Sequence, residues 1–411
     1  MTWYNKLQFA GMVLAVAGVA AEWHVGLWAT LFFGATSLVS VIAGLVTTHR
    51  FGNAALRPAL RWGLAAMVAY WLLLLTSVLY SSDIETAKNL LVLKATIVVF
   101  PLAVLLTDTS WLSAKHLRIL GYALTVTLFG SFLYYCGVAV GKMAGGASLA
   151  SVTDINFDPR HHTYTALYLS AAMLFVYYEL YRGWNTLPRW WRTLLLVAAP
   201  VFILYTILVN SRAGMLVMYA IEAFCVLHFA LSRRRWGKAV LLAVLLAGCT
   251  FGMEQAMPGY KNRISDTLDN VSGDVRFEIY SNNIDAAMES PIVGYGAGDY
   301  HERQEEQYAA SEFKAGMNRG YNAHNQYIET VLSTGFIGLA VLLMWMLWPL
   351  WMAWRRGARG PEFWLVLMLT FSMALNFMFE SILERQMGLL FVGALMPIMI
   401  LVVNEKLRIK N

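Results

Sequence analysis

Long apolar runs, interrupted once by a polar stretch, constrain this chain more than any other sequence feature. A membrane-spanning helix needs about 20 mostly apolar residues. We count about twelve such runs, two of them short: 7–21, 25–47, 62–80, 89–107, 117–140, 164–181, 193–209, 213–231, 239–253, 325–354, 363–379 and 388–403. Only 14% of the residues are charged and the mean hydropathy is +0.54, whereas about 25% of the residues in soluble domains are charged. The runs predict an all-α polytopic membrane protein with about twelve transmembrane helices.

The interruption divides the chain into three predicted parts. Residues 1–253 would form transmembrane helices one to nine, residues 254–322 one large loop, and residues 323–411 helices ten to twelve. Because the loop is long and has helical patterning of its own, we expect it to contain helices rather than to act as a linker.

One helix inside the loop can be predicted from its start signal and its periodicity. Asp274 can cap a helix that begins near Val275. Phe277, Tyr280, Ile284 and Ala287–Met288 would then share one face. This pattern predicts an amphipathic helix that lies against the membrane surface or covers a cavity.

The basic residues indicate how the chain is oriented in the membrane. If the N-terminus is cytoplasmic, every short cytoplasmic segment carries Lys or Arg, and together these segments hold 19 of the 31 basic residues. Cytoplasmic loops carry such an excess. We therefore expect both termini in the cytoplasm and the 254–322 loop outside it. The net charge of +6 is then a signal of topology, and no nucleic-acid partner is expected.

A histidine lies where the long loop returns to the membrane. His324 and its neighbour Asn325 stand at the start of the tenth apolar run. Imidazole is the side chain best suited to accept a proton near neutral pH. The positive end of a helix dipole would favour the neutral ring and attract an anionic substrate. The alternative, a histidine that only reaches interfacial water, stays open from position alone.

Three outward-side arginines lie outside the cytoplasmic pattern: Arg160, Arg212 and Arg276. Arg212 belongs to a very tight turn between two apolar runs, and charges at the membrane lip are functional by default. The planar guanidinium suits bidentate binding of phosphate. Each alone could instead pair with a lipid headgroup or a loop carboxylate. Together with a histidine, the three indicate an anion site.

Other polar residues carry weaker signals. His161 and His162 adjoin Arg160, but neighbouring histidines do not face together on a helix, so we interpret them as supporting polar groups rather than metal ligands. The spacing of Gly294, Gly296 and Gly298 is typical of a turn, not of a nucleotide-binding loop. The loop acids lack a metal-binding spacing. No metal and no cofactor are therefore expected. Lys94 and Glu222 lie within apolar runs, and the sequence leaves their role open.

Several short motifs, taken in order along the chain, resemble the O-antigen ligase family, within the wider group of O-antigen ligases, polymerases and protein O-oligosaccharyltransferases. The matching segments are Ser211–Arg212–Ala213–Gly214, Val275–Arg276–Phe277–Glu278, Ser290–Pro291–Ile–Val–Gly294–Tyr–Gly296, His324–Asn325 and Gly335–Phe–Ile–Gly338. The layout of spans with one late periplasmic loop resembles the family over the whole chain. The motifs separate the members of the wider group less well.

The resemblance implies a bacterial inner-membrane glycosyltransferase whose active site faces the periplasm. The implied donor is a glycan on undecaprenyl diphosphate, and the implied acceptor is a sugar hydroxyl of lipid A–core in lipopolysaccharide synthesis. The reaction would be metal-independent and inverting. His324 would act as base, with Arg276, Arg212 and Arg160 on the diphosphate and with Asn325, His161 and His162 in support. The roles could be partly reversed, with His324 on the diphosphate instead.

Two alternatives remain. An O-antigen polymerase or a protein O-oligosaccharyltransferase would use the same donor chemistry with a different acceptor. A transporter of polyprenyl-linked glycans also fits about twelve spans, but a transporter is expected to show two related halves and a site near the middle of the bilayer. The sequence shows no such halves, and its notable polar residues gather on one side.

Overall fold

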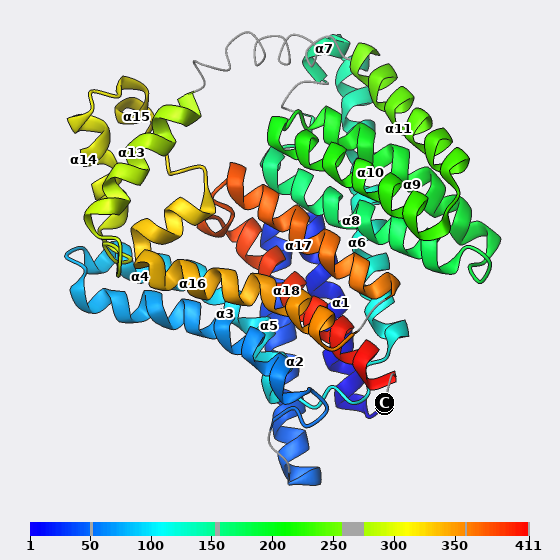
Figure 1. Cartoon of the computed structure of the whole chain (residues 1–411), viewed down its shortest axis with the longest axis horizontal. Helices are drawn as coiled ribbons and strands as arrows, with labels where there is room; N and C mark the ends of the chain where they lie inside the picture. The colour runs from blue at the N-terminus through cyan, green and yellow to red at the C-terminus, as the bar shows by residue number, and fades with distance from the viewer. Residues whose placement is uncertain (50–51, 153–156, 257–274, 358–359, 410–411) are drawn as a thin grey trace. The chain divides into compact units, whose positions relative to one another are not determined.

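The computed structural model describes residues 1–411 with the exception of 50–51, 153–156, 257–274, 358–359 and 410–411. All elements of the described residues are helical, which confirms the predicted fold class (Figure 1). The α-helices are α1 (Trp3–Ala21), α2 (Trp23–Thr48), α3 (Pro58–Ser77), α4 (Ile84–Lys94), α5 (Val99–Leu106), α6 (Ala114–Ala144), α7 (Leu149–Val152), α8 (His162–Gly183), α9 (Arg189–Leu208), α10 (Arg212–Arg233), α11 (Trp236–Ala256), α13 (Val275–Glu289), α14 (Tyr300–Ala310), α15 (Lys314–Arg319), α16 (Gln326–Arg355), α17 (Pro361–Phe379) and α18 (Gln386–Ile409). Short 3-10 segments η1 (Val78–Tyr80), η2 (Ala95–Val98) and η4 (Ile382–Glu384) join some of them.

Each predicted span coincides with helical structure, and the chain is a multi-pass membrane protein. Among the described residues, 9 helices are long and apolar enough to cross a membrane. The three predicted spans outside that set correspond to α1, α8 and α11, and α11 is apolar but shorter. The expected total of twelve stays a prediction.

Two compact units divide the chain, and each is described by itself. Unit 1 contains Met1–Leu120, Gly273–Arg359 and Phe377–Asn411. In it, α1 packs along α2, and α3 packs along α16. The α1–α2 pair is close because glycines face it: a Cβ atom on Gly26 would lie 2.8 Å from the Cα atom of Val19. Small residues allow helices to approach in this way inside membranes.

Unit 2 contains Gly121–Ser272 and Gly360–Asn376. Helix α8 is its most buried helix, with most of its side chains inaccessible to solvent, and it packs against α9 and α10. Gly214, in the first turn of α10, has no room for a side chain, because a Cβ atom there would lie 2.2 Å from the Cβ atom of Ala166. The start of α10 is therefore held against α8.

Helix α16 is broken at Gly335, and at this break the motif Gly335–Phe–Ile–Gly338 meets the motif Ser290–Gly296. Gly335 has φ 65° and ψ −169° inside the helix, a conformation that favours glycine. The loop after α13 fills the break: Tyr295 N–H donates to Leu332 O at 2.8 Å, and Phe336 N–H donates to Pro291 O at 2.7 Å. Backbone groups that the kink frees thus find partners in a neighbouring loop.

The predicted loop helix exists, and its predicted apolar stripe is only partly exposed, because Ala287 is buried and Tyr280 is half-buried. Helix α13 begins at Val275 among the described residues, whereas the proposed cap, Asp274, lies outside them. Phe277 and Ile284 are exposed, and the buried face is formed by Ile279, Asn282, Asn283, Ala286 and Ala287. In unit 1, α13 contacts α14 and α16, and α14 contacts α15 (Figure 1). The contact of the exposed stripe with the membrane surface stays a prediction.

Candidate functional site

His324 stands two residues before the start of α16, directly before the N-cap residue Asn325. Asn325 caps the helix, because its side-chain oxygen accepts hydrogen bonds from Tyr327 N–H at 2.9 Å and Ile328 N–H at 3.2 Å. His324 itself has φ 44°, a left-handed conformation uncommon for residues other than glycine. The imidazole is therefore set off from the helix axis, close to the positive end of the helix dipole.

A carboxylate contacts one nitrogen of the imidazole. His324 Nδ1 lies 3.1 Å from Glu380 Oε1, and 27% of the histidine side chain and 8% of the glutamate side chain are exposed. Glu380 follows the last residue of α17 and belongs to unit 1. A carboxylate on Nδ1 holds the proton there and leaves Nε2 as the nitrogen that can accept one. This is the arrangement that a general base requires.

The loops that carry His324 and Glu380 are fastened to each other by further side chains. Asn325 Nδ2 donates to Met378 O at 3.2 Å. The hydroxyl of Tyr280 donates to Met378 O at 2.9 Å and lies 3.3 Å from His324 O. Tyr280 of α13 therefore contacts the backbone both at His324 and at the end of α17.

Arg276 lies on the same side of α13 as Tyr280. The two residues are four positions apart, a spacing that makes side chains neighbours on a helix surface. Arg276 is half-buried. Since Tyr280 reaches the backbone of His324, the helix face that carries Arg276 is directed toward the histidine loop. Unit 1 thus brings two of the predicted site residues to one region.

The motif around Arg212 forms the turn between α9 and α10 and the first turn of α10. The hydroxyl oxygen of Ser211 accepts Gly214 N–H at 3.1 Å and caps α10. Asn210 adopts a left-handed conformation with φ 53°, which produces the predicted tight turn between α9 and α10. Gly214 allows close packing on α8, as described above. The Arg212 side chain is exposed at the N-terminus of α10, in unit 2.

Arg160, also in unit 2, is buried in an ion pair. Arg160 Nη2 lies 2.7 Å from Asp158 Oδ2, and Arg160 Nε donates to Asp158 Oδ1 at 2.9 Å. Tyr205 contacts both partners, and its hydroxyl donates to Asp158 Oδ2 at 2.9 Å. Only 7% of Arg160 is exposed. Its charge is thus compensated inside the protein, and its predicted role on a diphosphate stays a prediction.

His161 and His162 stack on each other beside Arg160. Their ring centroids are 4.6 Å apart and their planes differ by 16°. His161 also packs edge-on against Tyr164 at 5.2 Å. The predicted supporting role of the two histidines stays a prediction.

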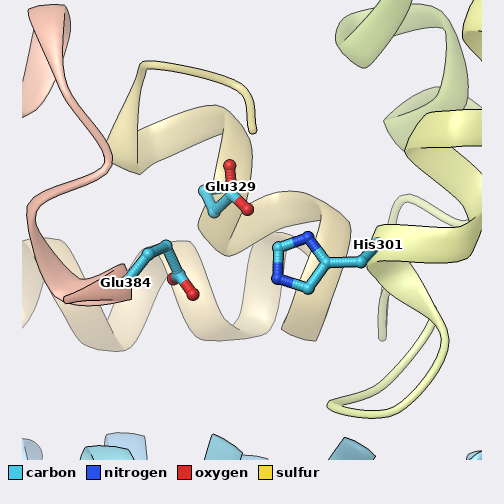
Figure 2. Close-up of side chains that lie close together, drawn as sticks. All are labelled: His301, Glu329 and Glu384. Atoms are coloured by element: carbon cyan, nitrogen blue, oxygen red, sulfur yellow. The ribbon is translucent and has the colours of Figure 1, made fainter. Parts of the chain in front are cut away.

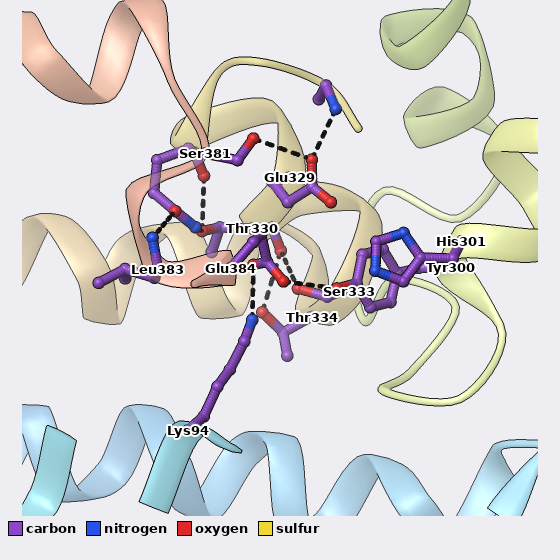
Figure 3. A network of polar contacts seen from close by, with 12 residues as sticks. Lys94, Tyr300, His301, Glu329, Thr330, Ser333, Thr334, Ser381, Leu383 and Glu384 are labelled. Atoms are coloured by element: carbon purple, nitrogen blue, oxygen red, sulfur yellow. Dashed lines mark hydrogen bonds and ion pairs between the residues drawn. The ribbon is translucent and has the colours of Figure 1, made fainter. Parts of the chain in front are cut away.

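A second polar cluster surrounds α16 one turn beyond His324. His301, Glu329 and Glu384 offer ligand atoms that all lie within 4.8 Å of one another, the one group of possible metal ligands among the described residues (Figure 2). Lys94 Nζ lies 2.6 Å from Glu384 Oε1, however, and Tyr300 donates to Glu384 Oε2 at 2.8 Å (Figure 3). Because an ammonium already compensates Glu384, we interpret the cluster as an internal ion-pair network.

The network shifts the pKa values of Glu384 and Tyr300, which lie outside the membrane-spanning helices. Burial raises the pKa of the Glu384 carboxyl, but the Lys94 ammonium, His301 and the hydrogen bonds from Lys94 and Tyr300 together outweigh burial and hold that pKa below its ordinary value. Burial raises the pKa of the Tyr300 hydroxyl well above its ordinary value, and Glu384 adds to this rise. Tyr300 therefore stays a hydrogen-bond donor at every physiological pH.

Sequence reasoning missed Glu380 and Glu329. Glu380 stands directly after an apolar run, in a short loop, and is separated from His324 by 56 positions. An acidic residue at such a boundary was the available signal, but the pairing depends on tertiary structure. Glu329 lies one turn into the tenth predicted span, where a fully buried carboxylate is costly and thus informative.

Comparison with known proteins gives a match to one family model over part of the chain. Residues 197–343 match the family model described as O-antigen ligase. The resemblance to the O-antigen ligase family is thereby confirmed. The matched segment contains Arg212, Arg276, His324 and Glu329, whereas Arg160 and Glu380 lie outside it.

Two curated relatives of this O-antigen ligase-like chain show partial similarity. An uncharacterized protein of Haemophilus influenzae is 31% identical over 108 residues, 25% of this chain and 27% of the relative. The exopolysaccharide production protein ExoQ of Rhizobium meliloti is 38% identical over 71 residues, 17% of this chain and 16% of the relative. The chain thus matches well under a third of each relative. The matches support a polysaccharide-related membrane enzyme.

Proposed function

We propose that this protein transfers a glycan from undecaprenyl diphosphate to a sugar hydroxyl of lipid A–core, as an O-antigen ligase. The contact between His324 Nδ1 and Glu380 Oε1 at 3.1 Å is the observation that carries the proposal. It provides a base whose tautomer is set by a carboxylate, at the mouth of a membrane-spanning helix. Membrane lipids, the lipid-linked donor and the lipid A–core acceptor are the proposed partners.

In the proposed reaction, Nε2 of His324 takes the proton from the acceptor hydroxyl as its oxygen attacks the anomeric carbon. The bond from that carbon to the diphosphate oxygen breaks, and undecaprenyl diphosphate leaves with the electron pair. Attack from the opposite face inverts the anomeric centre. Glu380 stabilises the imidazolium that forms, and no step needs a metal ion or another cofactor.

Arg276 is proposed to stabilise the negative charge that develops on the leaving diphosphate. Preorganised cations directed at developing charge are a large source of catalysis, and a guanidinium can contact two phosphate oxygens at once. Arg276 lies on the α13 face whose Tyr280 reaches the His324 backbone. Arg212 and Arg160 of unit 2 stay predicted diphosphate contacts, with the buried ion pair arguing against Arg160.

The proposed location follows from the basic residues. We propose that the protein lies in the bacterial inner membrane, with both termini in the cytoplasm and the 254–322 loop and His324 on the periplasmic side. A periplasmic site would have no access to cytoplasmic nucleotide sugars, which favours a lipid-linked donor.

A polymerase is the second candidate, since one relative is named an exopolysaccharide production protein. Its acceptor would be a second lipid-linked glycan. A protein O-oligosaccharyltransferase would use a protein hydroxyl.

Acceptor choice tests the proposal. Purified protein in nanodiscs is given an undecaprenyl diphosphate-linked glycan with lipid A–core, with no added acceptor, or with a pilin-type protein. We expect glycan on lipid A–core, at a rate that EDTA does not change. Growth of the lipid-linked glycan alone would identify a polymerase, glycan on the protein would identify an oligosaccharyltransferase, and no transfer in any arm would refute an enzymatic role.

A further inference from the structure

We propose that Glu329 is a positioning residue, which holds the loop carrying His324 and the loop carrying Glu380 at the separation that their contact needs. Glu329 is in the first turn of α16 and is completely inaccessible to solvent. No step of the proposed reaction uses it. The inference rests on the proposed function for its kinetic consequence, but its structural part can be tested without any activity.

One carboxylate oxygen bridges the two loops. Glu329 Oε2 accepts Ala323 N–H at 2.8 Å and the hydroxyl of Ser381 at 3.1 Å. Ala323 directly precedes His324, and Ser381 directly follows Glu380. Figure 3 shows the Glu329 carboxylate between Ser381 and a backbone nitrogen of the facing loop. His324 and Glu380 are therefore each next in sequence to a residue that donates a hydrogen bond to Glu329 Oε2.

A second side chain of the same helical turn repeats this link. Gln326 Oε1 accepts Leu383 N–H at 2.6 Å, and Gln326 Nε2 donates to Thr330 Oγ1 at 3.2 Å (Figure 3). Gln326 is fully buried. The first turn of α16 thus holds the segment after α17 at Ser381 and at Leu383, and Asn325 holds the end of α17 at Met378. The loop that presents Glu380 is fixed on both sides of that residue.

Glu329 also connects this arrangement to the loop helices. Gln304 of α14 approaches Glu329 Oε2 with its Nε2 atom at 3.5 Å and donates to Asn283 Oδ1 of α13 at 2.8 Å. Asn283 in turn donates to the carbonyl oxygen of Ile279 at 2.7 Å. Because that carbonyl can only accept, the amide of Asn283 has a defined orientation, and Gln304 Nε2 is the donor both to Asn283 Oδ1 and to Glu329 Oε2.

The bridge matters because the His324–Glu380 contact joins two separate loops at the membrane lip. The backbone of His324 is in a left-handed conformation, which persists where surrounding contacts determine it. The N–H of Ala323 and the hydroxyl of Ser381 are buried donors whose partner is Glu329, and buried polar groups need such partners. Loss of the carboxylate would release both loops next to the reacting groups.

The experiment compares Glu329→Ala with Glu329→Gln in the full-length protein in nanodiscs. The amide oxygen of glutamine can still accept from Ala323 and Ser381, whereas alanine cannot. Hydrogen–deuterium exchange should rise in peptides covering 320–325 and 378–383 for Glu329→Ala, and should stay near wild type for Glu329→Gln. In the transfer assay, Glu329→Ala should lose about 100-fold in kcat, the scale of a displacement of about 1 Å, with KM little changed, while Glu329→Gln should keep most of kcat.

Tyr300→Phe is the matched control, because Tyr300 is equally buried and its hydroxyl donates to Glu384 rather than to either loop. It should leave exchange in both loops and kcat near wild type. Unchanged exchange in Glu329→Ala would overturn the structural inference, whatever the activity. Raised exchange with unchanged kcat, or an equal loss of kcat in Tyr300→Phe, would overturn the positioning role. If the wild-type protein transfers no glycan, the proposed function fails, and the exchange data still decide whether Glu329 holds the loops.

Discussion

The polar groups around His324 in unit 1 and those around Arg160 in unit 2 differ in how far they are buried and paired inside the protein. At Arg160, the guanidinium and Asp158 are both buried and bond to each other and to Tyr205. At His324, the imidazole is partly exposed and contacts Glu380 through one nitrogen. The first arrangement satisfies its charges internally, whereas the second leaves part of the imidazole accessible to solvent.

The difference shows that position at a membrane lip does not by itself identify a functional charge. Arg160 and His324 both follow polar segments and both precede a long helix. A carboxylate two residues before Arg160 pairs with it locally, whereas the carboxylate near His324 comes from a different loop. Long-range pairing of this kind holds a reactive group in place and leaves part of it accessible.

The substitution His324→Ala should have the largest effect on the unit 1 side of this comparison. It removes the proposed base, and general bases contribute about 10²–10⁴-fold to rate. We expect transfer to lipid A–core to fall by about 10³-fold, with membrane-inserted protein at wild-type abundance. Initial rates and immunoblots of membranes measure the two quantities. Activity within about tenfold of wild type would require a new assignment of the base.

Glu380→Gln should show a smaller loss, because the imidazole stays but its tautomer is no longer fixed. A glutamine can donate to Nδ1 as well as accept from it, so part of the histidine would carry its proton on Nε2 and could not act as base. We expect kcat to fall by about 10- to 100-fold with KM little changed. A matched variant, Glu384→Gln, changes a neighbouring buried glutamate without touching the histidine. An equal loss of kcat in both variants would contradict a specific role for Glu380.

Arg160→Ala should act through stability and not through chemistry. It leaves Asp158 buried without its cation, which typically costs about 3–5 kcal/mol when such a pair is broken. We expect low abundance and a lower melting temperature. The double variant Asp158→Ala/Arg160→Ala removes both charges and should recover abundance and transfer activity. A double variant that is abundant but inactive would instead support Arg160 as a diphosphate contact.

The fold could be predicted where the bilayer imposes it, and the site only where its residues are close in sequence. Hydropathy located the long apolar helices, since backbone groups inside lipid must be paired within a helix. The capping signal at Asn325 and the tight turn before Arg212 are local, so both could be inferred. The contact of His324 with Glu380 and the bridge made by Glu329 depend on loops that meet only in the folded chain. The Asp158–Arg160 pair was readable from its spacing, but its burial was not.

The smallest effect we predict concerns the pH dependence of stability at the Lys94–Glu384 pair. The folded-state pKa of Glu384 lies below its ordinary value, which is about 4.3 for an unperturbed glutamate. The pair therefore contributes stability that is fully present above about pH 4.3 and is lost as pH falls through the lowered pKa.

Thermal unfolding in nanodiscs between about pH 3 and pH 7 measures this contribution. On acidification, the melting temperature of the wild type should fall by on the order of a few degrees more than that of Glu384→Gln, because the variant has no carboxyl to protonate at this position. The exposed pair of Arg303 and Glu306, with its atoms 2.5 Å apart, provides the control, since surface ion pairs contribute little. Glu306→Gln should unfold as wild type does at each pH. If the melting temperature of Glu384→Gln fell as much at low pH as that of the wild type, the buried pair would not be the group that titrates.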